Sequence, residues 1–366
     1  MKRYKMTLTI LSPVHIGAGR QVDPLEYMVK KKDDYFWFYH LDTARFLENL
    51  TPPLRTQFDD AIKQATPVYL RKFITQHIDP EKYQLFQTTI SDEFVAAYRS
   101  SFASMNNQLQ VELFPRNGLD RLPYLPGSSL KGAIRTAVVS SLAKPNNIEG
   151  DRDKGIWIEK KLFGYNDPKQ DPFKMLRITD APLPDNATFI DQTKIYKPNT
   201  KAGMPDPGGI KMFYEQCFSF LDDEEITAEG ILEINDDLIG KKGVDRRGNP
   251  VDAVSRSLSD EDILRACREF YLPKMEAEHR EFYASHHDAE PYSLALLNKV
   301  KYAPNECPIR IGRFCHVECH TLDLYRNPKT RRNRNGRPLP WGTTRTLSAG
   351  TMPMGWAKLR LDLIRS

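Results

Sequence analysis

The first residues of the chain alternate between polar and apolar side chains. From Tyr4 to Ile10 every second residue is apolar, which is the period-two pattern of a half-buried strand. The stretches 26–30 and 35–40 flank a Lys-Lys-Asp-Asp turn and are expected to form a hairpin. Similar patterns predict further strands at 108–114, 177–180, 188–196, 213–232, 309–324 and 356–364.

Between these strands the apolar positions recur at helical spacing. Helices are expected at 42–50, 56–101, 128–143, 156–162 and 259–287. Asp42 is suited to cap the first of them, and Ser259 with Asp262 forms a capping-box variant at the start of the last. Pro273 is expected to kink this last helix, because proline lacks the backbone N–H that a helix interior needs.

Strands and helices alternate along the chain, with long inserts between them and without an internal repeat. This order favours the α+β class. At 366 residues the chain is long enough for one large, elaborated domain, which we expect to span 1–366. Within it we expect a helical insertion at 42–107 and a long helix at 259–288. The stretches 198–209, rich in proline and glycine, and 240–257, rich in lysine and arginine, are expected to be loops.

The composition is that of a globular protein, since 40% of the residues are hydrophobic and 28% are charged. No apolar run approaches the roughly 18 residues that a membrane span needs, and the first residues lack the apolar stretch of a signal peptide. We therefore expect a cytoplasmic protein without a membrane partner. The five cysteines are few and odd in number, so we expect reduced thiols rather than a disulfide framework.

Positive charge is concentrated in one stretch, 324–345, which we call the basic segment. The whole chain carries 53 lysines and arginines against 48 aspartates and glutamates, a formal net charge of +5. The basic segment contains no acidic residue, and its basic residues are Arg326, Lys329, Arg331, Arg332, Arg334, Arg337 and Arg345. Arginine is suited to bidentate phosphate contacts and to stacking on bases. The segment therefore predicts a site for RNA or another polyanion.

Two glycine-bearing segments are candidates for binding phosphate. The first, 15–20 (HIGAGR), follows the first strand, where glycines let backbone amides approach a phosphate closely; a simple turn is the alternative. The second, 127–132 (GSSLKG), places two hydroxyls and a lysine at the start of a helix, whose free N–H groups favour an anion; an ordinary N-cap is the alternative. Neither segment has the spacing of a dinucleotide fingerprint or of a Walker loop.

Metal sites have weaker support in the sequence. The cysteines and histidines between Cys315 and His320 lie in a predicted strand, where thiols and imidazoles would point to opposite faces and would not share one zinc ion. A zinc-dependent module stays open as an alternative. Asp23, Asp33 and Asp34 are carboxylates that a metal-assisted hydrolase would use, and a hairpin turn explains the last two equally well. We expect neither a metal nor another cofactor.

Several segments together resemble one protein family. These are LSPVHIGAG at 11–19, YLPGSSLKGAIR at 124–135, LFG at 162–164 and RITD at 177–180. They are similar to segments of the RAMP superfamily of CRISPR ribonucleoproteins. The start SPVHIGAG…DPLEYMV and the stretch GTMPMGWAKL at 350–359 resemble one branch in particular, the fifth subunit of the Csm, or type III-A, effector complex.

The resemblance implies a ferredoxin-like, RRM-type core with helical insertions and a protruding thumb-like loop. The thumb-like strands and loops would occupy 182–257, and the loop 198–212, with Met204 and Met212, would wedge between bases. The residues that the resemblance assigns to RNA contact are His15, Gly17, Gly19, Ser128, Ser129, Lys131 and Arg135. Arg20, in the first glycine-bearing segment, is a further candidate. From the basic segment, the candidate RNA contacts are Arg331, Arg332, Arg334 and Arg345.

The leading hypothesis is a non-catalytic, RNA-binding structural subunit that caps the backbone filament of a type III-A CRISPR ribonucleoprotein and holds the 3′ part of the guide RNA (crRNA). It would support guide maturation and antiviral defence. Its expected partners are the crRNA, the backbone RAMP subunits and the small helical subunit of the complex, with target RNA as a further candidate. The alternative is a RAMP-type endoribonuclease that acts on guide or target RNA through His15, or through Asp23 and a divalent metal.

Overall fold

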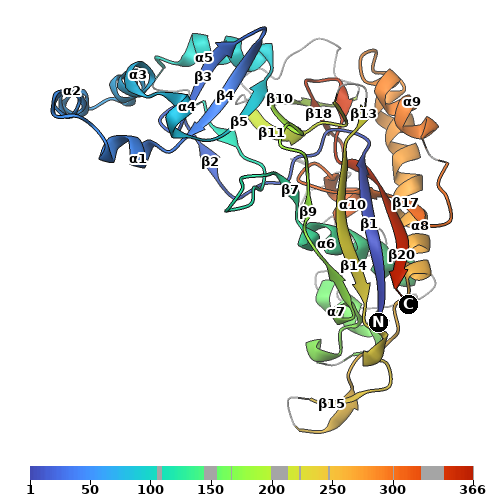
Figure 1. Ribbon diagram of the computed structural model, residues 1–366. Helices are drawn as coiled ribbons and strands as arrows, with labels where there is room; N and C mark the ends of the chain where they lie inside the picture. Colours follow the sequence, from blue (N-terminus) through green and yellow to red (C-terminus); the bar gives the residue numbers. More distant parts are fainter. Residues whose placement is uncertain are drawn as a thin grey trace, which may run out of the picture.

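The computed structural model describes residues 1–104, 109–143, 155–165, 167–198, 213–221, 224–245, 248–299, 301–322 and 342–365. The described chain forms two main β-sheets with packed helices, and the two sheets lie side by side (Figure 1). One sheet contains both the first and the last strand, and the other carries the helices α1 to α5.

The first sheet is antiparallel and has the order β17-β20-β1-β14-β8. Its strands are β1 (Lys2–Ile10), β8 (Leu176–Ile178), β14 (Thr227–Ile234), β17 (Glu306–Arg310) and β20 (Trp356–Arg365). The alternation predicted for β1 holds in its first half, where Met6 is fully buried and Lys5, on the other face, pairs with Glu229 at 2.7 Å. In its second half both faces are buried, because Thr7 and Thr9 are buried as well as Leu8. Helices α6 (Gly127–Ala143) and α8 (Asp260–Glu278) cover the inner face and share one apolar core with β1 (Figure 1).

The second sheet has the order β2-β6-β11-β10-β5-β4-β3. Its strands are β2 (Gln21–Val22), β3 (Tyr27–Lys32), β4 (Tyr35–Leu41), β5 (Gln84–Ile90), β6 (Val111–Glu112), β10 (Thr188–Tyr196) and β11 (Phe213–Cys217), with β18 (Arg345–Ser348) and β19 (Met352–Pro353) joined to it through β10. The predicted hairpin is confirmed as β3 and β4. On one face of this hairpin Tyr27 and Phe38 are fully buried against Phe94 of α5 (Asp92–Ser101).

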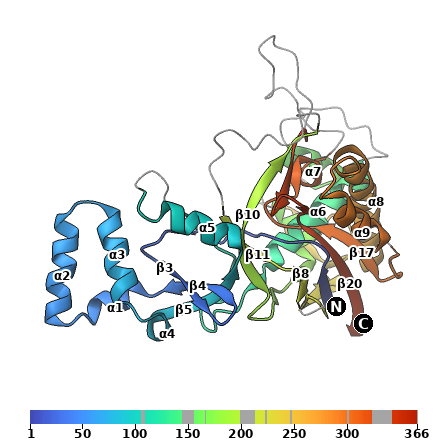
Figure 2. The same ribbon diagram turned by 90° about the horizontal axis from the view of Figure 1, so that it is seen from above.

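Four helices lie together at the outer end of the second sheet (Figure 2). They are α1 (Thr43–Glu48), α2 (Pro52–Lys63), α3 (Pro67–His77) and α4 (Pro80–Tyr83). Asp42 caps α1 as predicted, because its side chain accepts a hydrogen bond from the backbone N–H of Arg45 at 3.0 Å. Phe46 and Phe73 belong to one apolar cluster with Tyr39 of β4, so the group packs on the face of the hairpin opposite α5.

The remaining elements are shorter or connect the two sheets. The helices are α7 (Gly155–Phe163), α9 (Glu290–Asn298), α10 (His316–His320) and the π-helix η4 (His279–Tyr283). The 3₁₀ turns are η1 (Pro168–Gln170), η2 (Pro172–Lys174) and η3 (Asp236–Leu238). Three short strand pairs are β7 (Tyr124–Leu125) with β9 (Ala181–Pro182), β12 (Phe220–Leu221) with β13 (Glu224–Glu225), and β15 (Lys242–Val244) with β16 (Pro250–Asp252). At the start of α8 the predicted capping box of Ser259 and Asp262 is present. Pro273 lies inside α8, and helical structure continues through η4 to Tyr283.

The helical prediction for 56–101 was wrong in part, because β5 interrupts it. Within this strand Phe86 and Thr88 are buried on one side while their neighbours are less buried, which is a strand alternation. Its end is rich in β-branched residues, which favour a sheet. The predicted loop 240–257 also contains a short hairpin, β15 with β16.

The strand predicted at 309–324 was wrong beyond Arg310, where β17 ends and the short helix α10 follows. Gly312 has a φ of +90° and His316 a φ of +55°, and such left-handed residues cannot continue a strand. Cys315 and Cys319 are both buried, which fits residues four positions apart on one face of a helix.

The combination of an antiparallel sheet with packed helices is an α+β fold, as predicted. The ferredoxin-like arrangement and the domain boundaries remain predictions. Among the described residues, no helix has both the length and the apolar character needed to cross a bilayer. All five cysteines are free and buried.

Candidate nucleic-acid interface

The glycine-bearing segment after β1 forms the first wall of a cavity. Val14 holds this segment against β11 through two backbone hydrogen bonds with Cys217, of 3.2 and 2.7 Å. The chain is exposed from Gly17 to Arg20, and Gly19 has a φ of +71° that a residue with a side chain rarely adopts. His15, by contrast, is buried.

His15 is only 1% exposed, and its ring packs edge-on against Tyr214 with 4.8 Å between the ring centres. Its Nδ1 lies 2.7 Å from the carbonyl oxygen of Glu215. Burial lowers the pKa of His15, and the hydrogen bond to the Glu215 carbonyl opposes this shift only in part. The other ring nitrogen, Nε2, is buried and has no hydrogen-bond partner in the described part of the chain.

The second wall is the start of α6. Gly127 approaches β8 so closely that a Cβ atom on it would lie 2.3 Å from the carbonyl oxygen of Ile178, so only glycine fits there. Its N–H donates to Asp180 Oδ1 at 2.8 Å, which anchors the first turn. Ser128 is exposed and Ser129 is half-buried, and both line the cavity. Their hydroxyls therefore lie at the positive end of the helix dipole.

The third wall consists of Gly312 and Arg313, just after β17. These two residues were not predicted from the sequence as part of a binding site. The backbone N–H of Arg313 donates to the carbonyl oxygen of His15 at 2.9 Å, and a Cβ on Gly312 would lie 2.3 Å from the same oxygen. The side chain of Arg313 is 48% exposed and pairs with Glu112 at 3.4 Å. The sequence contains one hint of this wall, because the Gly-Arg pair at Gly312-Arg313, after β17, is the same as the pair at Gly19-Arg20, after β1.

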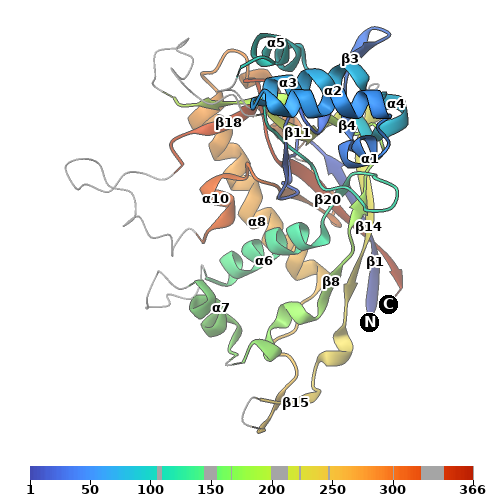
Figure 3. The same cartoon turned by 90° about the vertical axis from the view of Figure 1, so that its left-hand side faces the viewer.

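The three walls enclose a cavity of about 420 Å³, which we call the α6 cavity. Its lining residues are Ile16, Gly17, Ser128, Ser129, Gly132, Ala133, Thr136, Arg310, Ile311, Gly312, Arg313, Cys315, Cys319 and His320. α10 lies beside α6 and supplies the last three of these residues together with the turn before it (Figure 3). Two of the three segments predicted to contact RNA thus meet at one cavity, with an additional arginine between them.

Lys131 and Arg135 of α6 do not line this cavity and already have partners. Lys131 Nζ donates to the carbonyl oxygen of Leu176 at 2.6 Å, and burial lowers the pKa of this lysine. Arg135 forms ion pairs with Glu159 of α7 at 2.5 Å and with Asp171 at 2.8 Å. These contacts join α6 to β8 and α7, and the predicted phosphate contacts of the two residues remain predictions.

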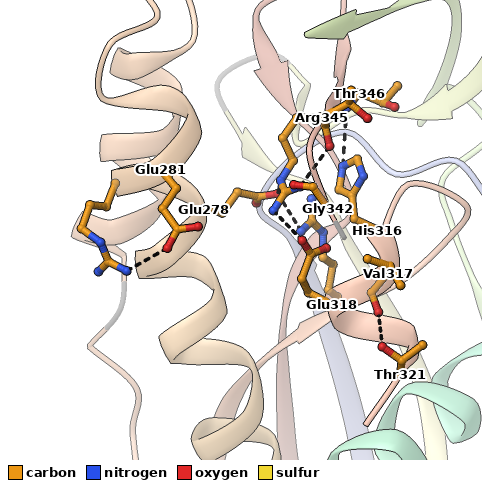
Figure 4. Close-up of polar contacts among 12 residues, drawn as sticks. Glu278, Glu281, His316, Val317, Glu318, Thr321, Gly342, Arg345 and Thr346 are labelled. Carbon is orange, nitrogen blue, oxygen red and sulfur yellow. Dashed lines mark hydrogen bonds and ion pairs between the residues drawn. The ribbon is translucent and has the colours of Figure 1, made fainter. Parts of the chain in front are cut away.

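Arg345 of β18 is 4% exposed and lies in a buried ion-pair cluster (Figure 4). Its Nε lies 2.6 Å from Glu278 Oε1 on α8, and its Nη2 donates to Glu318 Oε1 on α10 at 3.2 Å. Arg310 reaches the same Glu278 oxygen from β17 at 2.9 Å. Protein carboxylates thus surround the guanidinium of Arg345, and the RNA contact predicted for this residue remains a prediction.

The other predicted site residues fall into two groups. Arg20 is exposed and pairs with Glu26, and Asp23 Oδ1 accepts a hydrogen bond from the backbone N–H of Leu25 at 2.7 Å within a turn. Outside the described residues lie Arg331, Arg332 and Arg334 of the basic segment and Met204 and Met212 of the predicted thumb. Within the described ranges, no three histidine, cysteine or acidic side chains come close enough together to hold a metal ion.

The fold and the α6 cavity define an α+β protein with a glycine loop and a serine-bearing helix start on one open surface. The family model of the RAMP superfamily matches residues 7–265. The chain therefore belongs to the RAMP superfamily.

The curated relatives of the chain are Csm5 proteins of CRISPR systems. The chain is 27% identical over 222 residues to Csm5 of Streptococcus thermophilus, a match that covers 56% of this chain and 59% of the relative. It is 26% identical over 214 residues to Csm5 of Mycobacterium tuberculosis (strain CDC 1551 / Oshkosh), covering 50% of this chain and 55% of the relative. The matched part thus spans between half and two thirds of the length of these relatives.

Solved structures share the fold over almost the whole chain. A chain of the Csm–crRNA–target RNA ternary complex of a type III-A CRISPR–Cas system matches with a TM-score of 0.68 and 20% identity, covering 98% of this chain and 100% of that chain. The crystal structure of Csm5 from T. onnurineus matches with a TM-score of 0.58 and 19% identity, covering 96% and 99% of the two chains. At these identities the likeness shows a common fold.

Proposed function

We propose that this protein is an RNA-binding structural subunit of a type III-A CRISPR ribonucleoprotein. It caps the backbone filament, holds the 3′ part of the crRNA, and so supports guide maturation and antiviral defence. Its partners are the crRNA, the backbone RAMP subunits and the small helical subunit, with target RNA as a further candidate. The names of the Csm5 relatives and the similarity to a chain of a Csm–crRNA–target RNA complex support this proposal.

The observation that carries the proposal is the meeting of three polar walls at the α6 cavity. Ser128 and Ser129 offer hydroxyls at a helix start, the glycine loop offers backbone, and Arg313 offers a half-exposed guanidinium. Such groups suit the phosphates and sugars of a nucleic acid chain. Among the described residues that line the cavity there is no Phe, Tyr or Trp, and His320 has the one aromatic ring, so contacts to the backbone are favoured over base stacking. The guide would then read sequence by base pairing.

The test is a salt titration of RNA binding by the purified full chain. Fluorescence anisotropy with a single-stranded RNA derived from a CRISPR repeat gives the affinity at several salt concentrations between about 50 and 200 mM. Arg313→Ala is expected to weaken binding and to reduce the salt slope by about 1, because one phosphate contact is lost. The matched control is Arg3→Ala, since Arg3 is 49% exposed and pairs with Glu233 at 3.5 Å on the outer face of the first sheet.

Absence of RNA binding at the lowest salt, or equal effects of Arg313→Ala and Arg3→Ala, would contradict the proposal. The same samples test the endoribonuclease alternative. Prolonged incubation with and without Mg²⁺ is expected to leave the RNA at full length. Cleavage that disappears in His15→Ala or Asp23→Ala would instead favour the nuclease.

A further inference from the structure

His15 carries a buried ring nitrogen to which no described residue forms a hydrogen bond. The ring is 1% exposed, yet Nε2 lacks a hydrogen-bond partner among the described residues. A buried polar atom without a partner costs free energy, so its presence beside a cavity calls for a ligand group that completes it.

The hydrogen bond of Nδ1, on the other side of the ring, determines whether the ligand group must donate or accept a hydrogen bond. The Glu215 carbonyl oxygen, 2.7 Å from Nδ1, can only accept a hydrogen bond, so Nδ1 carries the proton. Burial lowers the pKa of His15 and keeps the ring neutral near pH 7. A neutral imidazole with its proton on Nδ1 has a lone pair on Nε2. Nε2 is therefore an acceptor, and it calls for a donor such as a hydroxyl rather than for a phosphate oxygen.

Gly17 lies between the α6 cavity, which it lines, and this nitrogen, which is itself closed to solvent. A Cβ atom on Gly17 would lie 3.8 Å from Nε2, and its next nearest neighbour would be Gly19 N at 4.0 Å. Gly17 is exposed and lines the cavity. Because Nε2 is closed to solvent, a ligand oxygen reaches hydrogen-bond distance from it only if the exposed loop around Gly17 shifts to admit the ligand.

We propose that Nε2 of His15 accepts a hydrogen bond from the ribose 2′-hydroxyl of a nucleotide bound in the α6 cavity, so that His15 selects RNA over DNA. The 2′-hydroxyl is the donor that distinguishes the two nucleic acids. The inference rests on the proposed function, because it places a specificity residue in the same RNA site. It assigns His15 no part in cleavage.

The first test variant is His15→Asn. The side-chain amide of asparagine can keep a donor near the position of Nδ1, facing the Glu215 carbonyl, but has nothing in place of Nε2. Affinities are measured for an RNA and for a DNA of the same sequence that contains uracil, so that only the 2′-hydroxyls differ. In His15→Asn the preference for RNA is expected to fall about 2- to 10-fold, the size of one net hydrogen bond, while DNA affinity stays the same.

The second variant, Gly17→Ala, tests the path instead of the nitrogen. The φ of Gly17 is not in the left-handed region, so alanine is compatible with its backbone. The nearest atom to the new methyl group would be 3.8 Å away. The methyl group occupies the space through which the hydroxyl would reach Nε2. We expect the same loss of RNA preference as in His15→Asn, with the His15–Glu215 hydrogen bond intact.

The control is His40→Asn, which removes another buried histidine, on β4 and outside the cavity lining. The ring nitrogens of His40 also lack a hydrogen-bond partner within the described part of the chain. This variant is expected to leave the RNA preference unchanged even if it lowers stability. Unchanged preference in both His15→Asn and Gly17→Ala would overturn the inference, as would equal binding of RNA and DNA by the parent chain. If a base amino group were the donor, RNA and DNA affinities would fall together, which also overturns it. Failure of the proposed function is a different result, namely no RNA binding by the parent chain at all.

Discussion

Arg345 Nε lies 2.6 Å from Glu278 Oε1, and this pair joins β18 to α8 in the interior of the protein (Figure 4). Glu278 is 3% exposed and also accepts from Arg310 Nη1 at 2.9 Å and, through Oε2, from Trp356 Nε1 at 3.0 Å. One carboxylate thus contacts two buried guanidinium groups and one indole N–H, while Glu318 is a second acidic partner of Arg345. Since Arg310 also lines the α6 cavity, the cluster fixes one wall of the proposed RNA site.

Glu278→Ala is expected to lower the free energy of unfolding by about 3–5 kcal/mol, because it leaves two buried arginines without their shared counter-ion. Glu281→Ala is the matched control, since Glu281 lies three residues further on and pairs with Arg280 on the surface at 3.1 Å. An exposed pair contributes at most about 1 kcal/mol. Urea unfolding curves measure both values, and similar losses for the two variants would refute a buried cluster of this strength.

Gly127→Ala is expected to destabilise the protein by about 3 kcal/mol, because the new Cβ would lie 2.3 Å from the carbonyl oxygen of Ile178 and would push α6 away from β8. Gly132→Ala tests the same helix at a position where the new Cβ meets nothing within 4 Å. There alanine is expected to raise stability by about 1 kcal/mol through its higher helix propensity. Thermal unfolding of the two variants should therefore shift in opposite directions.

The ion pair between Arg135 and Glu159 is expected to stabilise the contact of α6 with α7. The pair is 2.5 Å long, and each side chain is about a quarter exposed. A double-mutant cycle with Arg135→Gln and Glu159→Gln is expected to give a coupling free energy of about 1 kcal/mol. A coupling of zero would mean that solvent screens the pair, and Asp171, 2.8 Å from Arg135 Nη1, would then be the remaining ion-pair partner of Arg135.

Stability is expected to fall as the pH falls below about 6.5, because buried histidines resist protonation in the folded state. Burial, reinforced by Arg20 and Arg116, lowers the pKa of His40 to about 4, and burial lowers that of His316 to about 2. The unfolded chain binds these protons near pH 6.5, so stability is complete above that pH and is lost as the pH falls towards 4. For His40 the loss between pH 7 and pH 5 is about 2 kcal/mol.

Urea titrations at several pH values check this dependence. In His40→Asn the slope of unfolding free energy against pH between about 6 and 5 should decrease by nearly one proton, or about 1.4 kcal/mol per pH unit. His287→Asn is the control, because it makes the same change at a histidine whose side chain is exposed. An unchanged slope in His40→Asn would show that His40 is accessible to solvent.

The start of α6 could be predicted from the sequence because its signals are local. Leu130 and Ile134 recur at helical spacing, and both are fully buried against the first sheet. The position of this helix beside the glycine loop could not be predicted in the same way. The contact of His15 with Glu215 joins positions 200 residues apart, and no spacing along the chain encodes it.

The pattern before α10 was ambiguous for a physical reason. Cys315 and Cys319 are two strand repeats apart and also about one helical turn apart, so periodicity alone fits both structures. The left-handed φ of Gly312 and of His316 ends the strand, and the close approach of Gly312 to the His15 carbonyl oxygen depends on the tertiary structure. For the same reason Arg313 was missed, since its partner Glu112 is far away in the sequence.

The pairing of β1 with β20 has a consequence for how the protein is made. The two strands lie side by side in the middle of the first sheet, and Trp356 N donates to Ser12 Oγ across 344 positions of the chain. During synthesis on the ribosome, β1 can pair with β20 only after about 350 further residues have been made. Until then the edges of β1 and β17 are unpaired and open to aggregation. Any shortened version that ends before Trp356 would keep that defect permanently, so it should accumulate in inclusion bodies.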